Sequence, residues 1–317
     1  MIKLFSITRR VLVTSLPVTY VVRKSKQIRP PGFQGIPLYD VIKFFFAQVR
    51  KVGMVERASA ISFNIFMAIP PAIIFLFTLI PYLPISKEFI HQMFGLIRDV
   101  IPGEKNNASI IRFLNDFVTH PRNGLLSLGF VLALFYSSNA VMGIMRSFDK
   151  NYLGFTKRKA LHQRGVALKL TMILFVLVFA SVLVLVAQDA VLRLIGIRSA
   201  NVRSVINNIR WIVIVLLFFY MISYIYKHAP AVDKKWRLRN PGSILATGLM
   251  LLFTFLFAYY VNHFSNYNKL YGSIGTIMIL MLLIYFNSLV LLIGFELNVS
   301  ISSLKRLSES SSKKSAG

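Results

Sequence analysis

The stretch Met172-Ile-Leu-Phe-Val-Leu-Val-Phe-Ala-Ser-Val-Leu-Val-Leu-Val186 is apolar at every position except Ser181. With its flanks it extends over about Gly165–Ala187. A helix needs roughly 20 mostly apolar residues to cross the hydrocarbon core of a bilayer. This segment therefore predicts a membrane-spanning helix.

Five other segments are long and apolar enough to span a bilayer, and the one that begins at Trp211 is the shortest. Their bounds are about Ala58–Tyr82, Gly124–Met145, Trp211–Tyr226, Gly242–Val261 and Ser273–Leu297. The sequence therefore predicts an all-α fold, a polytopic membrane bundle of six transmembrane helices.

The composition agrees with a membrane protein. Of the 317 residues, 56% are hydrophobic and 15% are charged, whereas a soluble domain carries about 25% charged residues. This balance excludes a disordered chain and argues against a soluble enzyme. The chain has no cysteine, which excludes disulfides and thiolate metal sites.

The excess of basic residues predicts the orientation. The chain has 37 Lys and Arg against 11 Asp and Glu, a formal net charge of +26. If the N-terminus is inside, 26 Lys and Arg fall on the inner side and 10 on the outer side. Cytoplasmic loops of membrane proteins are enriched in Lys and Arg. Both termini are therefore expected in the cytoplasm.

The non-spanning parts divide the chain into three. Residues 1–36 form a basic N-terminal segment that could lie at the membrane interface, residues 37–300 the six-span membrane domain, and residues 301–317 a flexible basic tail. Pro37–Val55 has one apolar stripe and predicts an interfacial amphipathic helix before the first span. Two further stripes, Phe89–Val100 and Ile110–Val118, lie in the first outer loop and predict helices that rest on the bilayer or form a lid over a substrate.

Motifs for enzyme chemistry are missing. The sequence has no phosphate-binding loop and no Gly-x-Ser-x-Gly nucleophile motif. The five histidines are not spaced as ligand pairs; they are His91, His120, His162, His228 and His263. We therefore expect no enzyme, no cofactor and no metal site.

Polar residues within the spans form stripes along single helix faces. Candidate residues for a cavity or gate are Asn64, Pro70, Pro71, Asn139 and Asn287. Such stripes are typical either of helix packing or of helices around a partly hydrated cavity. Adjacent prolines kink or break a helix, and broken helices are a feature of transporter sites. A structural kink is the alternative.

Glu296 is the one carboxylate within a predicted span, and it lies near the cytoplasmic end. At 100° per residue it points away from Asn287. Arg57 and Arg146 reach the same side of the membrane, so Glu296 is expected to form a buried ion pair with one of them. A proton-coupling carboxylate is the alternative.

Three stretches carry a resemblance to a known family. They are Arg57–Phe63 leading to Pro70-Pro71, Pro230 through Trp236 to Gly242, and Tyr267–Asn298, where the motif residues are Tyr271, Gly272, Gly275, Gly294 and Asn298. Over about Pro37–Ser300 the chain resembles the YihY/BrkB family, once labelled ribonuclease BN-like. The family usually has Ala where Phe295 stands. The resemblance implies a multi-pass protein of the bacterial inner membrane and no established activity. RNA cleavage would need a water-exposed catalytic cluster, which the sequence does not show.

Three functions fit these observations. The first is a transporter or facilitator, not driven by ATP, for a lipid or another amphipathic molecule of the cell envelope. The second is an ion- or proton-coupled transporter that uses Glu296, and the third is a scaffold for envelope integrity without transport. In each case the expected partners are membrane lipids, with anionic lipid at the basic cytoplasmic face. No specific nucleic acid is expected, and the sequence leaves the oligomeric state open.

Overall fold

The computed structural model describes residues 16–51, 53–82, 123–149, 154–156, 158–194, 200–233, 235–264 and 273–315, together with residues 90, 111–112, 115–116 and 152. Within these ranges the chain is helical, and its β-structure is limited to an isolated bridge between Phe155 and Val232. The two stripes expected in the first outer loop lie almost entirely outside the described residues.

Six long helices cross the molecule, and five of them have stretches long and apolar enough to span a membrane. The sixth, α9, carries the shorter apolar stretch Ile212–His228. The six helices are α4 (Met54–Leu79), α7 (Asn123–Phe148), α8 (Ala160–Leu194), α9 (Ala200–His228), α10 (Pro241–Phe264) and α12 (Ser273–Ser315). The prediction of a polytopic helical bundle is confirmed.

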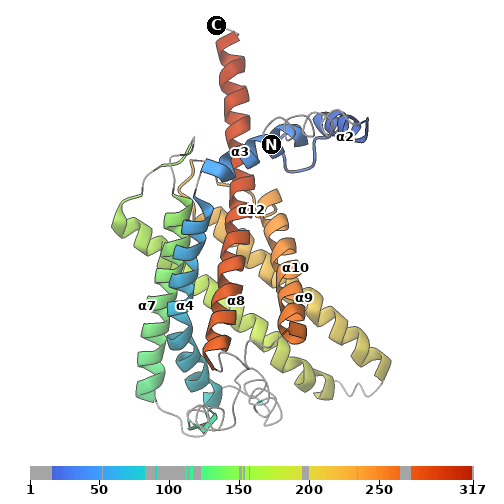
Figure 1. Ribbon diagram of the computed structural model, residues 1–317. Coiled ribbons are helices and arrows are strands. Elements are labelled where there is room, and N and C mark those ends of the chain that lie inside the picture. The colour runs from blue at the N-terminus through green and yellow to red at the C-terminus, as the bar shows by residue number, and fades with distance from the viewer. Residues whose placement is uncertain are drawn as a thin grey trace.

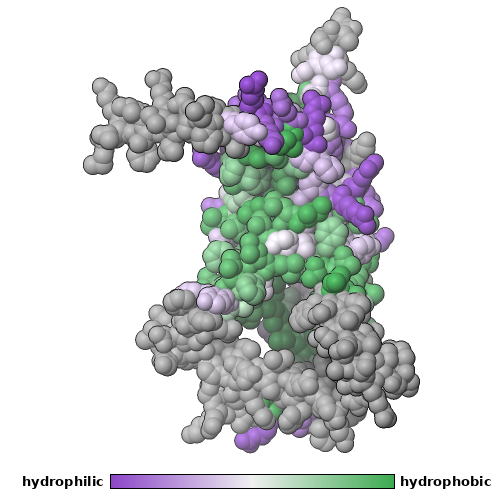
Figure 2. Space-filling model, turned by 90° about the vertical axis from the view of Figure 1, so that its right-hand side faces the viewer, coloured by the Kyte–Doolittle hydropathy of each residue, from purple (hydrophilic) through white to green (hydrophobic). Residues whose placement is uncertain are grey.

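Both ends of the described chain lie on the same side of the bundle (Figure 1). Helix α2 (Leu16–Gln27) and the end of α12 project there, beyond the six crossing helices. Figure 2 shows a broad hydrophobic belt around the bundle, with hydrophilic side chains gathered above it on this side. A belt of this kind is what a bilayer covers, because lipid tails cannot solvate polar groups.

Helix α3 (Leu38–Lys51) lies across this end of the bundle, as its amphipathic pattern predicts. It packs against α12 and buries Val41 completely. Ile42 and Phe46 remain exposed. An apolar face left uncovered at this level is suited to the headgroup boundary of a membrane.

Helix α4 continues through Pro70 and Pro71, so the break suggested by the sequence does not occur. The reason is support from a neighbour, because α4 packs along α7 more extensively than along any other described element. Gly129 of α7 brings the two backbones close, since a Cβ there would lie 3.5 Å from Cα of Phe75. Neighbouring helices commonly stabilise proline-containing turns within membranes. After Leu79 the chain forms one 3-10 turn, Ile80–Tyr82.

The C-terminal tail also differs from the prediction of a flexible segment. In the structure α12 extends through residues 301–315. Ile301 and Ser303 are still buried against the bundle. Beyond them the Ser308 hydroxyl donates to the carbonyl of Lys305, and Lys305 lies 3.8 Å from Glu309. Once a packed helix is nucleated, each added residue costs little, so the serine-rich segment can propagate it.

Packing is uneven along the bundle. Among the described residues, one buried hydrophobic cluster draws on the same end of all six helices, for example Met54–Ile61 of α4, Val141–Phe148 of α7 and Val290–Val299 of α12. We call this end, which lies on the side of the chain termini, the closed end. The opposite half of the bundle contributes nothing to this cluster.

Helix α10 shows most clearly that burial differs between the two ends of the bundle. Its first half buries Gly242, Ala246 and Met250. From Leu251 to Tyr260 every residue is exposed except the half-buried Phe253 and Phe257. Helices α8 and α9 are strongly inclined, and the ends at which they meet lie far from α4 and α7 (Figure 1). We call the part of the bundle opposite the closed end the open half.

Candidate functional site

An ion pair lies at the centre of the closed end. Nη1 of Arg57, in the first turns of α4, lies 2.7 Å from Oε1 of Glu296 on α12. The Arg57 side chain is 6% exposed and that of Glu296 is 0% exposed. The structure therefore brings together two of the three residues expected to form a buried pair, and it links the first and last long helices of the bundle.

The connection between α7 and α8 completes this cluster. The Tyr152 hydroxyl donates to Oε1 of Glu296 at 2.6 Å, and Nη2 of Arg57 donates to the carbonyl oxygen of Ser147. Burial raises the pKa of Tyr152, and the neighbouring Glu296 raises it further. Tyr152 therefore stays protonated at neutral pH and remains a hydrogen-bond donor. Sequence reasoning missed Tyr152 because it lies outside the spans.

The ion pair leaves two polar atoms without a partner. Within the part of the chain that the structure describes, Oε2 of Glu296 and Nε of Arg57 are buried and make no hydrogen bond. A buried polar atom without a partner is costly. The two atoms are therefore the least well satisfied part of this cluster.

Arg146, the other candidate partner of Glu296, is exposed. Its neighbours Met145 and Ser147 are buried. A helix turns by about 100° per residue, so a side chain between two inward-facing ones can point outward. The sequence fixes the height of Arg146 on α7 but not the rotation of α7 about its axis.

Hydrogen bonds of Asn298 join the beginning of α10 to α12. Its Oδ1 accepts the backbone N–H of Gly242 at 2.9 Å, and its Nδ2 donates to Oδ1 of Asn240 at 2.7 Å. The same oxygen of Asn240 accepts the backbone N–H of Ser243 at 2.8 Å, which makes Asn240 the N-cap of α10. Pro241 then occupies the first helical position, where its missing N–H costs nothing.

Gly294 gives α12 the closest approach to α10. A Cβ on Gly294 would lie 2.5 Å from the carbonyl oxygen of Gly242, and one on Gly242 would lie 2.1 Å from the carbonyl oxygen of Gly294. Neither position has room for a side chain. Contacts between small residues are a general means of bringing membrane helices together.

Phe295, at the position where the resemblance implies Ala, fills the core of the closed end. Its ring stacks on that of Phe148, with centroids 3.9 Å apart and planes 2° apart. Together with Gly294, Glu296 and Asn298 it gives the motif at the end of the last span a structural role in joining α12 to α4, α7 and α10. Of the other motif residues, Gly275 is buried in α12, whereas Tyr271 and Gly272 lie outside the described residues.

The polar residues expected to line a cavity do not converge in the described structure. Nδ2 of Asn64 donates to the carbonyl of Ala60, and Nδ2 of Asn287 donates to that of Leu283, so each bonds within its own helix. Oδ1 of Asn139 accepts a hydrogen bond from Nη1 of Arg164 on α8 at 2.5 Å.

The two prolines do not converge on such a cavity either. Pro70 is exposed and Pro71 is half-buried. In the described structure, these five residues therefore do not surround a common cavity.

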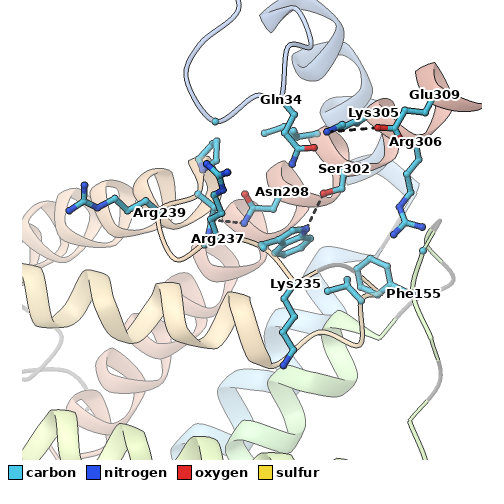
Figure 3. A pocket seen from close by; sticks show the side chains of 17 residues that line it. Gln34, Phe155, Lys235, Arg237, Arg239, Asn298, Ser302, Lys305, Arg306 and Glu309 are labelled. Carbon is cyan, nitrogen blue, oxygen red and sulfur yellow. Dashed lines mark hydrogen bonds and ion pairs between the residues drawn. The ribbon is translucent and has the colours of Figure 1, made fainter. Parts of the chain in front are cut away.

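A cavity of about 600 Å³ lies instead at the outer side of the closed end (Figure 3). Four parts of the chain line it: the loop before α3, the connection between α7 and α8, the loop between α9 and α10, and the part of α12 from Asn298 onward. Five basic residues and one acidic residue line it: Lys235, Arg237, Arg239, Lys305, Arg306 and Glu309. We call this the basic pocket. The sequence predicts a basic cytoplasmic face but not that basic residues before α10 would meet α12, because the last helix was expected to end before Lys305.

The comparisons with known proteins agree with this description. A family model described as Virulence factor BrkB matches residues 45–317. The "Putative ribonuclease-like protein YfkH" of Bacillus subtilis is 29% identical over 257 residues, which are 80% of this chain and 91% of that protein. "UPF0761 membrane protein IL2447" of Idiomarina loihiensis is 26% identical over 219 residues, 68% of this chain and 73% of that protein. No solved structure matches significantly.

A multi-pass helical bundle, the family motif at the closed end and a match over most of the chain therefore lead to the same conclusion. The chain belongs to the BrkB family of membrane proteins.

Proposed function

We propose that this protein is a transporter or facilitator that moves a lipid or another amphipathic molecule of the cell envelope across the bacterial inner membrane without ATP. The uneven packing of the bundle is the observation that carries the proposal. A scaffold has no need for a bundle in which all six helices share one core at one end while α8 and α9 diverge from the closely packed α4 and α7 at the other. A transporter in one of its two access states has this form.

The open half supplies the surface that an amphipathic molecule would need. On the central helix α12, Ile277, Met278, Met281 and Leu282 are exposed, whereas Val290–Leu292 are buried. On α10 the exposed residues Leu251–Tyr260 include Thr254 and two tyrosines among apolar side chains. Acyl chains could therefore lie between the helices of the open half without leaving an apolar environment.

The closed end supplies the part that would have to move. Alternating access requires contacts that can be broken and remade, and these contacts are concentrated where α4, α10 and α12 meet. The pair Arg57–Glu296 and the hydrogen bond from Gly242 to Asn298 are among the polar contacts that hold this end together. We infer that opening this end separates α12 from α4.

Ion or proton coupling is the second candidate, and one observation favours it. Oε2 of Glu296 is buried without a hydrogen-bond partner among the described residues, so this carboxylate is not fully engaged by the protein. A proton transferred to Glu296 during transport would remove its charge and weaken its attraction to Arg57. Proton binding and opening of the closed end would then be linked.

Reconstituted vesicles test both candidates. Purified full-length protein in vesicles that contain a fluorescent short-chain phospholipid is exposed to a quencher from outside, without nucleotide. The fraction of lipid quenched should rise faster than in vesicles without protein. If transport is proton-coupled, a pH difference across the membrane should change the rate, and Glu296→Gln that remains folded should no longer show that dependence.

A crosslink separates transport from background leakage. The natural chain has no cysteine, and the rings of Phe253 on α10 and Phe286 on α12 lie 4.8 Å apart between centroids. A short bifunctional thiol crosslinker on Phe253→Cys/Phe286→Cys should slow lipid movement, and the two single-cysteine variants treated in the same way should not. Folded protein that gives no acceleration over empty vesicles would contradict transport and favour a scaffold.

A further inference from the structure

We propose that the basic pocket binds the phosphate group of an anionic membrane lipid. Five basic side chains and one carboxylate line a cavity of about 600 Å³, so its lining carries an excess of four positive charges. This is a defined cavity assembled from four parts of the chain, unlike the general attraction of a basic surface for a membrane. The proposal does not depend on transport, because a bound lipid could equally be a structural partner.

The walls of the pocket are held by contacts outside its basic residues. Trp236 is buried, and its Nε1 donates to Oγ of Ser302 at 2.9 Å. Asn298, also buried, is fixed by Asn240 and Gly242. The pocket therefore keeps its shape without a ligand, and a preformed site spends little binding energy on ordering.

The charges of the pocket are only weakly neutralised by the protein. Lys305 lies 3.8 Å from Glu309, and Arg306 lies 3.3 Å from Asp233. The side chains of both pairs are well exposed, and such surface pairs contribute little. An arginine guanidinium can bind phosphate through two parallel hydrogen bonds, and Arg237 and Arg239 belong to the lining beside the start of α10.

A lipid fits this position better than a soluble phosphate. The pocket includes Pro241, the first residue of α10. One turn further, an exposed stripe begins at Ile244 and continues through Gly248, Leu251 and Phe255 on the same helix face. A phosphate in the pocket would thus place an attached acyl chain along α10, within the hydrophobic belt shown in Figure 2.

Trp236 provides a direct measurement. The chain has two tryptophans, so Trp211→Phe leaves Trp236 as the single reporter in the wall of the pocket. Purified full-length protein is titrated with a short-chain phosphatidic acid, and binding is also counted by native mass spectrometry. We expect saturable binding of one phosphatidic acid molecule, with a change in Trp236 emission, and no such binding of a phosphatidylcholine of equal chain length.

Three variants locate the site. Arg237→Ala/Lys305→Ala should weaken binding about tenfold or more, because it removes two charged contacts to phosphate. Gln34→Glu, which adds a negative charge to the lining, should also weaken it. Arg23→Ala/Lys24→Ala removes the same charge from exposed positions on α2, away from the pocket, and should change the affinity less than twofold.

Three results would overturn the proposal. The first is an absence of saturable binding by both measurements, and the second is an equal loss of affinity in the α2 control, which would show a diffuse charge effect. The third is binding of glycerol phosphate as tight as that of the lipid, which would assign the pocket to a soluble phosphate compound. Lipid movement in vesicles is measured separately, so the failure of either proposal leaves the other to be judged by its own experiment.

Discussion

Arg57 and Glu296 are separated by 239 residues in the chain, yet Nη1 of one lies 2.7 Å from Oε1 of the other. Both side chains are buried, at the end of the bundle where hydrophobic packing is tightest. Because α4 and α12 are the first and last long helices, this contact closes the bundle. Under the proposed transport function, it is one of the polar contacts that opening of the closed end would have to break.

Removing one member of this pair should destabilise the protein. Glu296→Gln leaves Arg57 buried without its counter-charge, and breaking a buried pair in this way costs about 3–5 kcal/mol. Arg57→Gln should have a similar effect. The double variant should lose less than the sum of the two single variants, because their effects share one interaction. Thermal unfolding in detergent, followed by circular dichroism, measures these differences.

Arg146→Gln is the matched control, since it removes the same charge from an exposed position on α7. Its effect should stay within about 0.5 kcal/mol, as is usual for surface substitutions. Additive effects of Arg57→Gln and Glu296→Gln, or a large effect of Arg146→Gln, would show that the pair does not contribute as described.

The contact between α10 and α12 should not tolerate a single methyl group. In Gly242→Ala the new Cβ would lie 2.1 Å from the carbonyl oxygen of Gly294, so the two helices must move apart. We expect a loss of about 1–3 kcal/mol, typical of overpacking, measured as a lower melting temperature.

Gly248→Ala on the same helix is the control, because a Cβ there meets no atom within 4 Å. Alanine is the better helix former by up to about 1 kcal/mol, so this variant should be neutral or more stable. If Gly242→Ala behaved like Gly248→Ala, the close approach of the two helices would be wrong.

Tyr152 should make the stability of the folded protein depend on pH at high pH. Its hydroxyl donates to Glu296, and burial raises its pKa above the usual value of 10.0. The folded state thus holds this proton more tightly than the unfolded chain. The stabilising contribution is complete below about pH 10 and is lost as the pH rises towards the higher pKa of the folded state.

Tyr152→Phe should lower stability by about 1.5–3 kcal/mol at pH 7, the usual range for a hydrogen bond to a charged group. The difference from the natural protein should narrow above pH 10, because the variant has no proton to lose at this position. Unfolding curves at pH 7 and pH 10.5 measure this. A difference that is constant, or that widens with pH, would contradict the raised pKa.

Both ends of the chain are predicted to be cytoplasmic. Because the natural chain has no cysteine, a thiol reagent labels only the cysteine that is introduced. Tyr20→Cys on α2 and Ser310→Cys on α12 are at exposed positions and should react with a membrane-impermeant thiol reagent only after the cells are permeabilised. Ser109→Cys, in the predicted outer loop, should react in intact cells. Labelling of Ser310→Cys in intact cells would reverse the orientation.

The spanning helices could be predicted from the sequence because a bilayer imposes one simple requirement. A helix must present about 20 apolar residues to satisfy its backbone within hydrocarbon. The run 172–186 meets this requirement without reference to the rest of the chain. Glu296 likewise implied a basic partner, since an unpaired buried charge would be strongly unfavourable.

Only the tertiary structure could identify the partner of Glu296. Arg57 and Arg146 reach the same level of the membrane, and they differ only in the rotation of their helices. Tyr152 escaped prediction because a loop residue shows no periodicity. The C-terminal tail and the Pro70-Pro71 turn are helical although their local composition favours flexibility or a break. Packing against α7 maintains α4 at the prolines. The packed part of α12 allows that helix to continue into the tail.

The sequence by itself thus determined the membrane class, the approximate positions of the long apolar helices, and the need to neutralise Glu296. These properties depend on hydrophobicity and charge, which each segment carries whatever its neighbours are. Only the tertiary structure decided that Arg57 pairs with Glu296, that one buried core lies at one end of the bundle, and that residues from four separate segments form the basic pocket. These features depend on how helices rotate and approach one another, and contacts between segments far apart in the chain set that geometry.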